Sequence, residues 1–264
     1  MVPRKPVRSL EWTKRYPKGS KGEPPQRNNQ IPAFAMKENG MEIIKNVHLI
    51  PHVIANPYLI IDPDGLTLID SGIPGSEKKI LNYINNLGYK STDIKHILIT
   101  HADFDHIGGL AALKKVSGAS IYASEIEAEA IGIGRSSRQL KPEKLKLKIM
   151  YALANRFVKT APVQVDVFLV DGQILDVLGG LQVVATFGHT PRHLSFFSPS
   201  AGILFSGDSM VSDDNGLQRS VKDNTWNHGM AIESVRKQAA LGASIVCPGH
   251  GPVVKNASNK FPEL

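Results

Sequence analysis

The sequence predicts an α/β domain in which helices cover layers of β-sheet. Short runs rich in valine, isoleucine and leucine, separated by Asn-Pro and Asp-Gly turns, indicate strands at the start of the domain. From about residue 75, stretches with one apolar helical face alternate with further strands. The chain has 264 residues, of which 42% are hydrophobic and 21% charged, and this suits a globular domain with a large core.

Residues 1–40 are predicted to form a basic, proline-rich arm, and residues 41–264 form the domain itself. The arm holds six of the 17 prolines and nine Lys or Arg against three Asp or Glu, without a sustained apolar period. No apolar stretch of signal-peptide length follows its basic start. We therefore expect a cytoplasmic protein whose arm follows the surface or is partly disordered.

The first half of the domain is predicted to be a strand meander followed by alternating helices and strands. Ile80, Leu81, Ile84 and Leu87 recur at helical spacing after Ser76, a residue type that caps helices. The expected elements are strands at 42–50, 57–61 and 65–69, a helix at 75–87, a strand at 96–100, a short helix at about 107–116 and a strand at 119–122.

A helical insertion is predicted at about 123–160. Leu145, Ile149, Leu153 and Phe157 step by four residues, with lysines on the opposite face. This segment either caps a functional site or packs on the rest of the domain. The expected elements beyond it are strands at 166–170, 181–186, 194–197 and 203–207, a helix at about 230–241 and a strand at 244–247.

Positive charge is concentrated in two segments. The net charge of +7 divides into +6 in residues 1–40, +7 in residues 135–159 and −6 in the remainder. The net positive charge of the chain therefore does not by itself indicate a nucleic-acid-binding protein. No run of about 18 apolar residues occurs, which excludes a transmembrane helix. The single cysteine, Cys247, excludes a disulfide scaffold and a cysteine-based zinc cluster.

The segment Thr100-His-Ala-Asp-Phe-Asp-His-Ile-Gly-Gly109 places four metal-ligand types directly after a buried strand. Alternate residues of an extended segment share a face, so His101, Asp103 and Asp105 are expected to converge. His106 follows as the chain turns into a helix. Four imidazole or carboxylate groups within six residues, at the end of a strand, predict a site for a first-row metal.

Three glycine-containing turns repeat this placement later in the chain. His189 in Gly-His-Thr-Pro, Asp208 in Ser-Gly-Asp and His250 in Pro-Gly-His-Gly each follow a predicted strand. Glycine lets the backbone turn sharply or approach a site closely. One such turn carries little information, but four ligand-bearing segments in this order indicate a metal centre.

This pattern resembles the metallo-β-lactamase superfamily, whose hallmark is H-x-H-x-D-H followed by single His, Asp and His ligands. The resemblance covers about residues 42–255 and implies an αββα sandwich with a dinuclear metal centre at one sheet edge. It also implies that the first metal is bound by His101, Asp103 and His189, the second by Asp105, His106 and His250, and both by a bridging Asp208.

Each of four further residues near the motif has two alternative roles. Asp70, in Leu-Ile-Asp-Ser-Gly, matches a family aspartate beneath the ligands, or else is a turn residue before glycine. Arg192 replaces a family glycine, and it either contacts an anionic substrate or points to solvent. His193 and His228 either line the pocket or have packing and solvent roles, which we favour.

Asp103 departs from the family pattern, because the motif usually has a second histidine at this position. Carboxylates are harder ligands than imidazole. Zinc is the favoured metal at both positions, with iron or manganese as alternatives at the Asp103 site. The formal charges of two divalent metals, three aspartates and a bridging hydroxide sum to zero. This is one charge unit below a centre that has the usual histidine in place of Asp103. We therefore expect a less Lewis-acidic centre.

The resemblance implies a hydrolase in which a metal-bridging hydroxide, positioned by Asp105, cleaves a lactone, ester or thioester of a small molecule. Common class B β-lactamases have a cysteine near the position of Asp208, glyoxalase II enzymes have a helical C-terminal domain, and RNA-processing branches have a large insertion or an exosite arm. None of these features is evident, so the lactonase and esterase branch is favoured. The alternatives are a phosphodiesterase or nuclease that uses the basic segments, and a non-enzymatic ligand-binding protein.

Overall fold

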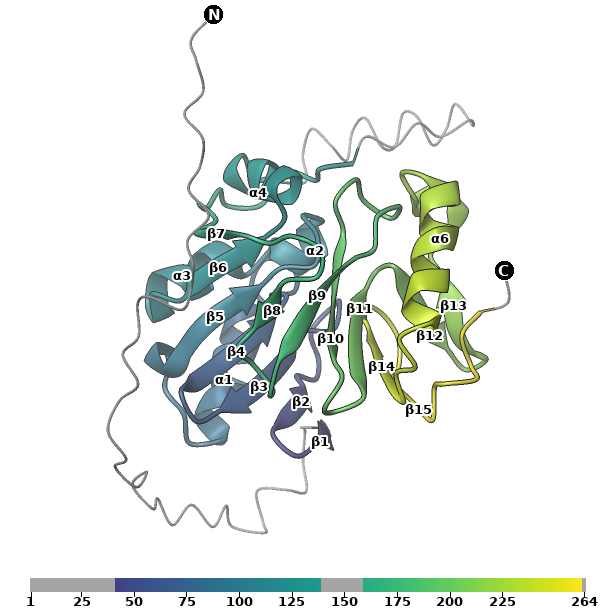
Figure 1. The fold of residues 1–264 in the computed structure, drawn as a ribbon. Helices are drawn as coiled ribbons and strands as arrows, with labels where there is room; N and C mark the ends of the chain where they lie inside the picture. Colours follow the sequence, from purple (N-terminus) through teal and green to yellow (C-terminus); the bar gives the residue numbers. More distant parts are fainter. Residues whose placement is uncertain (1–40, 139–158, 263–264) are drawn as a thin grey trace, which may run out of the picture. The chain divides into compact units, whose positions relative to one another are not determined.

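The computed structural model describes residues 41–138 and 159–262, and two β-sheets dominate this part of the chain (Figure 1). The strands of the first sheet, in spatial order, are β1 (Met41–Ile44), β2 (Val47–Leu49), β3 (Tyr58–Asp62), β4 (Gly65–Ile69), β5 (Ile94–Leu98), β6 (Ser120–Ala123) and β7 (Val167–Phe168). Neighbours from β1 to β4 are antiparallel, and those from β4 to β7 are parallel.

The second sheet is formed by the later part of the chain. Its strands, in spatial order, are β15 (Val254–Lys255), β14 (Ile245–Pro248), β11 (Ile203–Gly207), β10 (Leu194–Ser198), β9 (Leu181–Ala185) and β8 (Ile174–Leu175). Only β11 and β14 pair in parallel. A separate hairpin joins β12 (Met210–Asp213) to β13 (Gly216–Arg219).

Side-chain alternation along the strands builds the layers. In β3, Tyr58 and Ile60 pack into a core cluster shared with the second sheet, whereas Leu59 packs into a cluster on the outer face. Phe196 and Phe197 of β10 divide in the same way, with Phe196 between the sheets. Strands buried on both faces need a cover on each side, and the helices supply it.

Helices cover the outer face of each sheet. On the first sheet lie α1 (Glu77–Asn86), α3 (Leu110–Ser117) and α4 (Glu125–Gly132), and on the second lies α6 (His228–Ala239). Ile80 of α1, Leu113 of α3 and Val235 of α6 are among their fully buried contacts. The four layers confirm the predicted αββα sandwich (Figure 1). Among the described residues, no helix has the length and apolar character needed to cross a bilayer.

Several predicted boundaries were wrong. The run 42–50 is two strands, because Asn46 adopts a left-handed φ of 67° and reverses the chain. The helix expected at 107–116 is instead α2 (Phe104–Ile107) followed by α3. Ser76 precedes α1, but its side chain makes no capping hydrogen bond. The structure also contains β8, β12, β13 and β15, which are too short for a periodicity argument.

The predicted helical insertion is confirmed only in its first part. Helix α4 ends at Gly132, and a turn follows in which Gly134 has a φ of +64°. Residues 159–165 are not helical. The apolar residues Leu145, Ile149, Leu153 and Phe157, on which the prediction depended, lie outside the described residues.

Candidate metal centre

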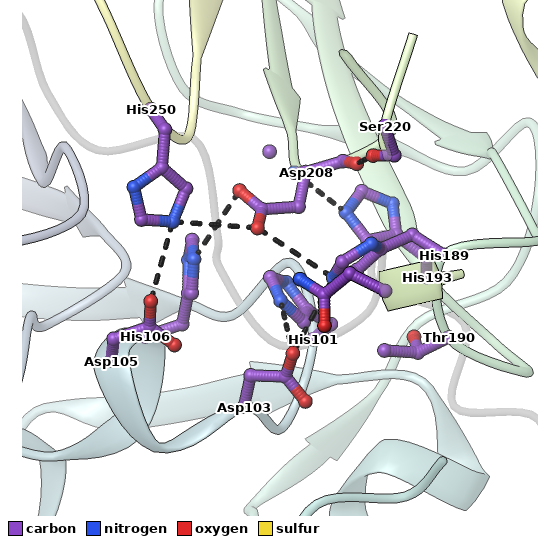
Figure 2. Close-up of polar contacts among 12 residues, drawn as sticks. His101, Asp103, Asp105, His106, His189, Thr190, His193, Asp208, Ser220 and His250 are labelled. Carbon is purple, nitrogen blue, oxygen red and sulfur yellow. Dashed lines mark hydrogen bonds and ion pairs between the residues drawn. The ribbon is translucent and has the colours of Figure 1, made fainter. Parts of the chain in front are cut away.

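The predicted ligands come together at one end of the sandwich (Figure 2). Each lies in a segment that follows a strand: His101 comes after β5, His189 after β9, Asp208 after β11 and His250 after β14. The first sheet therefore supplies the H-x-D-x-D-H segment and the second sheet supplies the three single ligands. The strand-end placement expected from the sequence accounts for this convergence.

His101, Asp103 and His189 form the first group of side chains. Oδ2 of Asp103 lies 3.5 Å from Nε2 of His101 and 3.4 Å from Nε2 of His189. All three residues are buried, and one ligand atom from each lies within 4.8 Å of the others. Two imidazoles and one carboxylate at this spacing are a suitable donor set for zinc or another first-row metal.

Asp105, His106 and His250 form the second group. Nε2 of His250 lies 3.3 Å from Oδ2 of Asp105, and the ligand atoms of the group again lie within 4.8 Å of one another. His106 is fully buried, whereas the side chain of His250 is 37% exposed. The second group therefore lies nearer to solvent than the first.

Asp208 lies between the two groups. Its Oδ1 is 3.4 Å from Nε2 of His106, and its Oδ2 is 3.6 Å from Nε2 of His189 and 3.4 Å from Nε2 of His250 (Figure 2). The carboxylate thus contacts an imidazole of the first group and two of the second. This is the position expected of a bridging ligand.

Buried polar atoms of the cluster lack hydrogen-bond partners within the described part of the chain. They are Nε2 of His101 and His106, both ring nitrogens of His189, and Oδ1 of Asp208. Buried polar groups are nearly always satisfied, because an unpaired one costs about 1–3 kcal/mol. Apart from Nδ1 of His189, the unpaired atoms lie beside one another where the two groups meet, so the donor set fits divalent metal ions.

The pKa of Asp208 is lowered, whereas those of His106 and His250 are raised and that of His189 is lowered by burial. Burial raises the pKa of Asp208, but His106, His250 and His189 outweigh it and hold this pKa well below its usual range. Burial likewise opposes protonation of His106, yet the carboxylates of Asp208 and Asp70 raise its pKa well above the usual value. Hydrogen bonds to Asp105 and Asp208 raise the pKa of His250 to about 9. In the absence of metal, protons therefore occupy nitrogens that would bind it.

Asp70 lies beneath the second group and orients it. Its Oδ2 is 2.8 Å from Nδ1 of His106, and its carboxylate accepts hydrogen bonds from the amide and the hydroxyl of Thr100 at 2.9 and 2.8 Å. Asp70 has a left-handed φ of +60°, uncommon outside glycine, and its amide donates to Leu98 at 2.9 Å. By holding Nδ1 of His106, Asp70 leaves Nε2 directed at the cluster.

The expectation that His101, Asp103 and Asp105 converge on one extended face was wrong. Asp103 has extended dihedral angles and precedes α2, but Asp105 and His106 lie inside that helix. The helical turn rotates Asp105 away from Asp103 and toward His250. The two aspartates consequently belong to different groups, as the family resemblance implies.

His193 is fully buried but has a supporting position. Its Nε2 accepts the backbone N–H of Asp208 at 3.0 Å, and its Nδ1 is 2.8 Å from the hydroxyl of Thr186. Burial and the neighbouring imidazoles hold the pKa of His193 well below its usual value, so the neutral ring can accept. Arg192 is exposed and lies over the ring of Phe187, and His228 begins α6.

Three residues around the site were not predicted from the sequence: Glu127, Ser136 and Arg138. Glu127 of α4 is fully buried and accepts hydrogen bonds from the amide of Ala102 at 2.8 Å and the hydroxyl of Thr190 at 2.7 Å. A carboxylate on the apolar face of a helix is a sequence signal that could have identified it. Ser136 and Arg138 contact Asp103 from an irregular segment, where no periodicity exists to reveal them.

Gly249 allows the second sheet to approach the cluster closely. A Cβ atom at this position would lie 2.1 Å from Oδ1 of Asp208, too close for any side chain. The glycine before His250 is therefore required by the packing of the backbone against the carboxylate. This confirms the close-approach role expected for that turn.

Comparisons with known proteins agree with this architecture. Residues 50–250 match the family model described as the metallo-beta-lactamase superfamily. The chain is 28% identical to the probable metallo-hydrolase YflN of Bacillus subtilis, over 85% of this chain and 92% of the relative. It is 31% identical to a hydroxyacylglutathione hydrolase of Rhodobacter capsulatus, over 60% of this chain and 48% of the relative. It also matches the structure of a Cronobacter sakazakii metallo-β-lactamase with a HARLDQ motif, at 25% identity and a TM-score of 0.61, over 80% of each chain.

Proposed function

Because the chain belongs to the metallo-β-lactamase superfamily, we propose that it is a dinuclear metal-dependent hydrolase that cleaves a lactone, ester or thioester bond of a small molecule. One observation carries the proposal: two groups of His and Asp side chains, joined by Asp208, direct unpaired ligand atoms toward one another. The likeness to a probable metallo-hydrolase supports the hydrolytic reaction.

Bound divalent metals would supply Lewis acidity and a water acidified to about neutral pH for attack on a carbonyl carbon. His101, Asp103 and His189 would hold one metal, and Asp105, His106 and His250 the other. Asp105, whose side chain is 17% exposed, is less buried than Asp103 and Asp208, and would orient the attacking water from the open side. Asp208 would set the separation between the two metal positions.

The bond type is proposed from a weaker set of observations. The relative named a hydroxyacylglutathione hydrolase favours a thioester, since acylated glutathione is one. Phe104 lies between Asp103 and Asp105 and is 46% exposed, and Trp226, whose amide donates to the carbonyl of His189, is 42% exposed. Large apolar side chains beside two ligand loops suit a substrate with an apolar part.

The first experiment is to measure metal content per chain by plasma mass spectrometry, on protein purified without added metal. We expect close to two equivalents, lost in Asp208→Ala and retained in Asp214→Ala, a matched change at an exposed aspartate. The same proteins are then assayed on lactone, ester, thioester, β-lactam and phosphodiester substrates. Zero metal in a folded chain would contradict the proposal, and phosphodiester turnover that falls steeply with salt would favour a nuclease.

A further inference from the structure

Arg138 lies against Asp103, the residue that replaces the usual second histidine of the motif. Nε of the guanidinium donates to Oδ1 of Asp103 at 3.2 Å, and Nη2 forms an ion pair with Oδ2. The side chains are only 11% and 5% exposed. A two-point contact with a planar guanidinium fixes the orientation of a carboxylate, which a single ammonium contact does not.

Arg138 contacts both oxygens of Asp103, and each oxygen has a further set of partners. Oδ1 also accepts a hydrogen bond from the hydroxyl of Ser136 at 2.6 Å, so it accepts from two donors. Oδ2 faces Nε2 of His101 and of His189 at 3.5 and 3.4 Å. Asp103 is therefore held with Oδ2 toward the two histidines and Oδ1 toward Ser136, while the guanidinium of Arg138 spans both oxygens.

Arg138 is itself anchored from a second direction. Its Nη1 donates to the backbone carbonyl of Asn224, at the end of the 3-10 turn Lys222–Asn224. A guanidinium that is mostly buried and bonded to both a carboxylate and a backbone carbonyl has a defined position. Its charge is thus a fixed part of the electrostatics around the first group.

We propose that Arg138 is a positioning residue that makes Asp103 a charge-balanced, single-oxygen ligand at the first metal position. This rests on the proposed function, since it assumes that a divalent metal is bound there. Replacing a neutral histidine by aspartate lowers the charge of this position by one unit, and Arg138 returns that unit. The sequence-based expectation of a less Lewis-acidic centre counted the ligands alone and is revised accordingly.

The test is metal affinity, measured by competition with a chromophoric chelator for Zn²⁺. Arg138→Met removes the charge and leaves Oδ1 with the Ser136 hydroxyl as its one remaining donor. We expect affinity to rise at least about tenfold, the size of one charge a few ångströms from a divalent ion even in a medium like water. Arg138→Lys keeps the charge and should stay within about threefold of the wild type. Arg236→Met, the same change at an exposed ion pair on α6, is the matched control and should have no effect.

A second readout is the visible absorption of the Co²⁺-loaded protein, which weakens as coordination number rises. We expect weaker absorption in Arg138→Met, because the carboxylate is then held away from the metal position by the Ser136 hydroxyl alone and can bind through Oδ1 as well. If that variant does not fold, Arg138→Gln keeps one donor for Asp103 without the charge and should likewise bind more tightly.

The outcomes separate this proposal from the proposed function. Unchanged or weaker metal binding in folded Arg138→Met would overturn the proposal for Arg138. Removing a residue that only supports the loop would leave metal affinity unchanged or lower it, and would not raise it. If Arg138→Lys bound Zn²⁺ as tightly as Arg138→Met, the claim that the charge of Arg138 offsets that of Asp103 would be wrong. A wild-type chain that takes up no metal would overturn the proposed function, whereas a metal-binding wild type insensitive to Arg138→Met would overturn this proposal alone.

Discussion

His250 is the most exposed histidine of the cluster, and its pKa is raised by neighbouring carboxylates. Its ring contacts two carboxylates, Asp105 and Asp208, at 3.3 and 3.4 Å. Hydrogen bonds to them raise its pKa from 6.5 to about 9. In the metal-free chain His250 is therefore protonated near neutral pH, and metal binding must release that proton.

This predicts how the stability of the metal-free chain changes with pH. A histidine with a raised folded pKa contributes its full stabilisation below the unfolded value of 6.5, and loses it as pH rises through about 9. The difference in free energy of unfolding between the wild type and His250→Gln should therefore shrink over that interval. Urea denaturation of chelator-treated protein across this pH range measures it.

The matched control for that series is His52→Gln, at an exposed histidine outside the cluster. Its difference from the wild type should vary much less with pH than that of His250→Gln. A gap between wild type and His250→Gln that stays constant across the interval would show that the ion pairs of His250 do not stabilise the fold.

The ligands could be predicted from the sequence, but their supports could not. Each ligand histidine follows a predicted strand and lies in a short motif, so a few neighbouring residues of the sequence are enough to identify His101, His189 and His250. Arg138 meets Asp103 across 35 residues, through a segment without periodicity. Such a contact depends on how loops pack, which no local pattern records.

Helix α4 connects the two ligand-bearing loops of the first group. Glu127 binds the amide of Ala102, next to His101, and also the hydroxyl of Thr190 and the amide of Arg192 at 2.7 and 3.2 Å. The hydroxyl of Ser124, just before the helix, donates to the carbonyl of Arg192 at 2.7 Å. The start of the predicted insertion thus fixes loops that come from different sheets.

Glu127→Gln should therefore weaken the first metal position more than the second. The side chain loses its charge, and its amide nitrogen replaces one of the two carboxylate oxygens. Either the amide of Ala102, or the hydroxyl of Thr190 and the amide of Arg192, then loses its acceptor. We expect a loss of about 2–4 kcal/mol in unfolding free energy and weaker uptake of one of two metal equivalents. Thermal denaturation and stepwise chelator competition measure the two effects.

Glu129→Gln is the control for this change, because Glu129 lies on the same helix with its side chain exposed. It should be nearly neutral in both measurements. Equal weakening of both metal equivalents in Glu127→Gln would contradict a specific role for α4 in the first group.

At the scale of the whole molecule, the cluster joins the two halves of the sandwich. His101, Asp103, Asp105 and His106 come from the segment after β5, whereas His189, Asp208 and His250 lie just after strands of the second sheet. The layered fold itself could be predicted, since strand and helix periodicities are local. The short strands β8 and β15 could not, because pairing with β9 and β14 defines them.

Because the ligands come from both sheets, metal removal should destabilise the entire domain and not only a loop. Unpaired imidazoles and carboxylates would then remain buried where the sheets meet, and the unfolded chain does not preserve their arrangement. At free metal about 1,000 times above Kd, binding contributes about 4 kcal/mol, or about 10 °C in Tm for a domain of this size. We expect chelation to lower Tm by that amount in a single transition, and metal to restore it. Asp208→Ala should show no metal-dependent shift, while Asp214→Ala should behave as wild type. An unchanged Tm in a chain shown to have lost its metal would mean that the sheets hold together without it, and that the cluster serves chemistry alone.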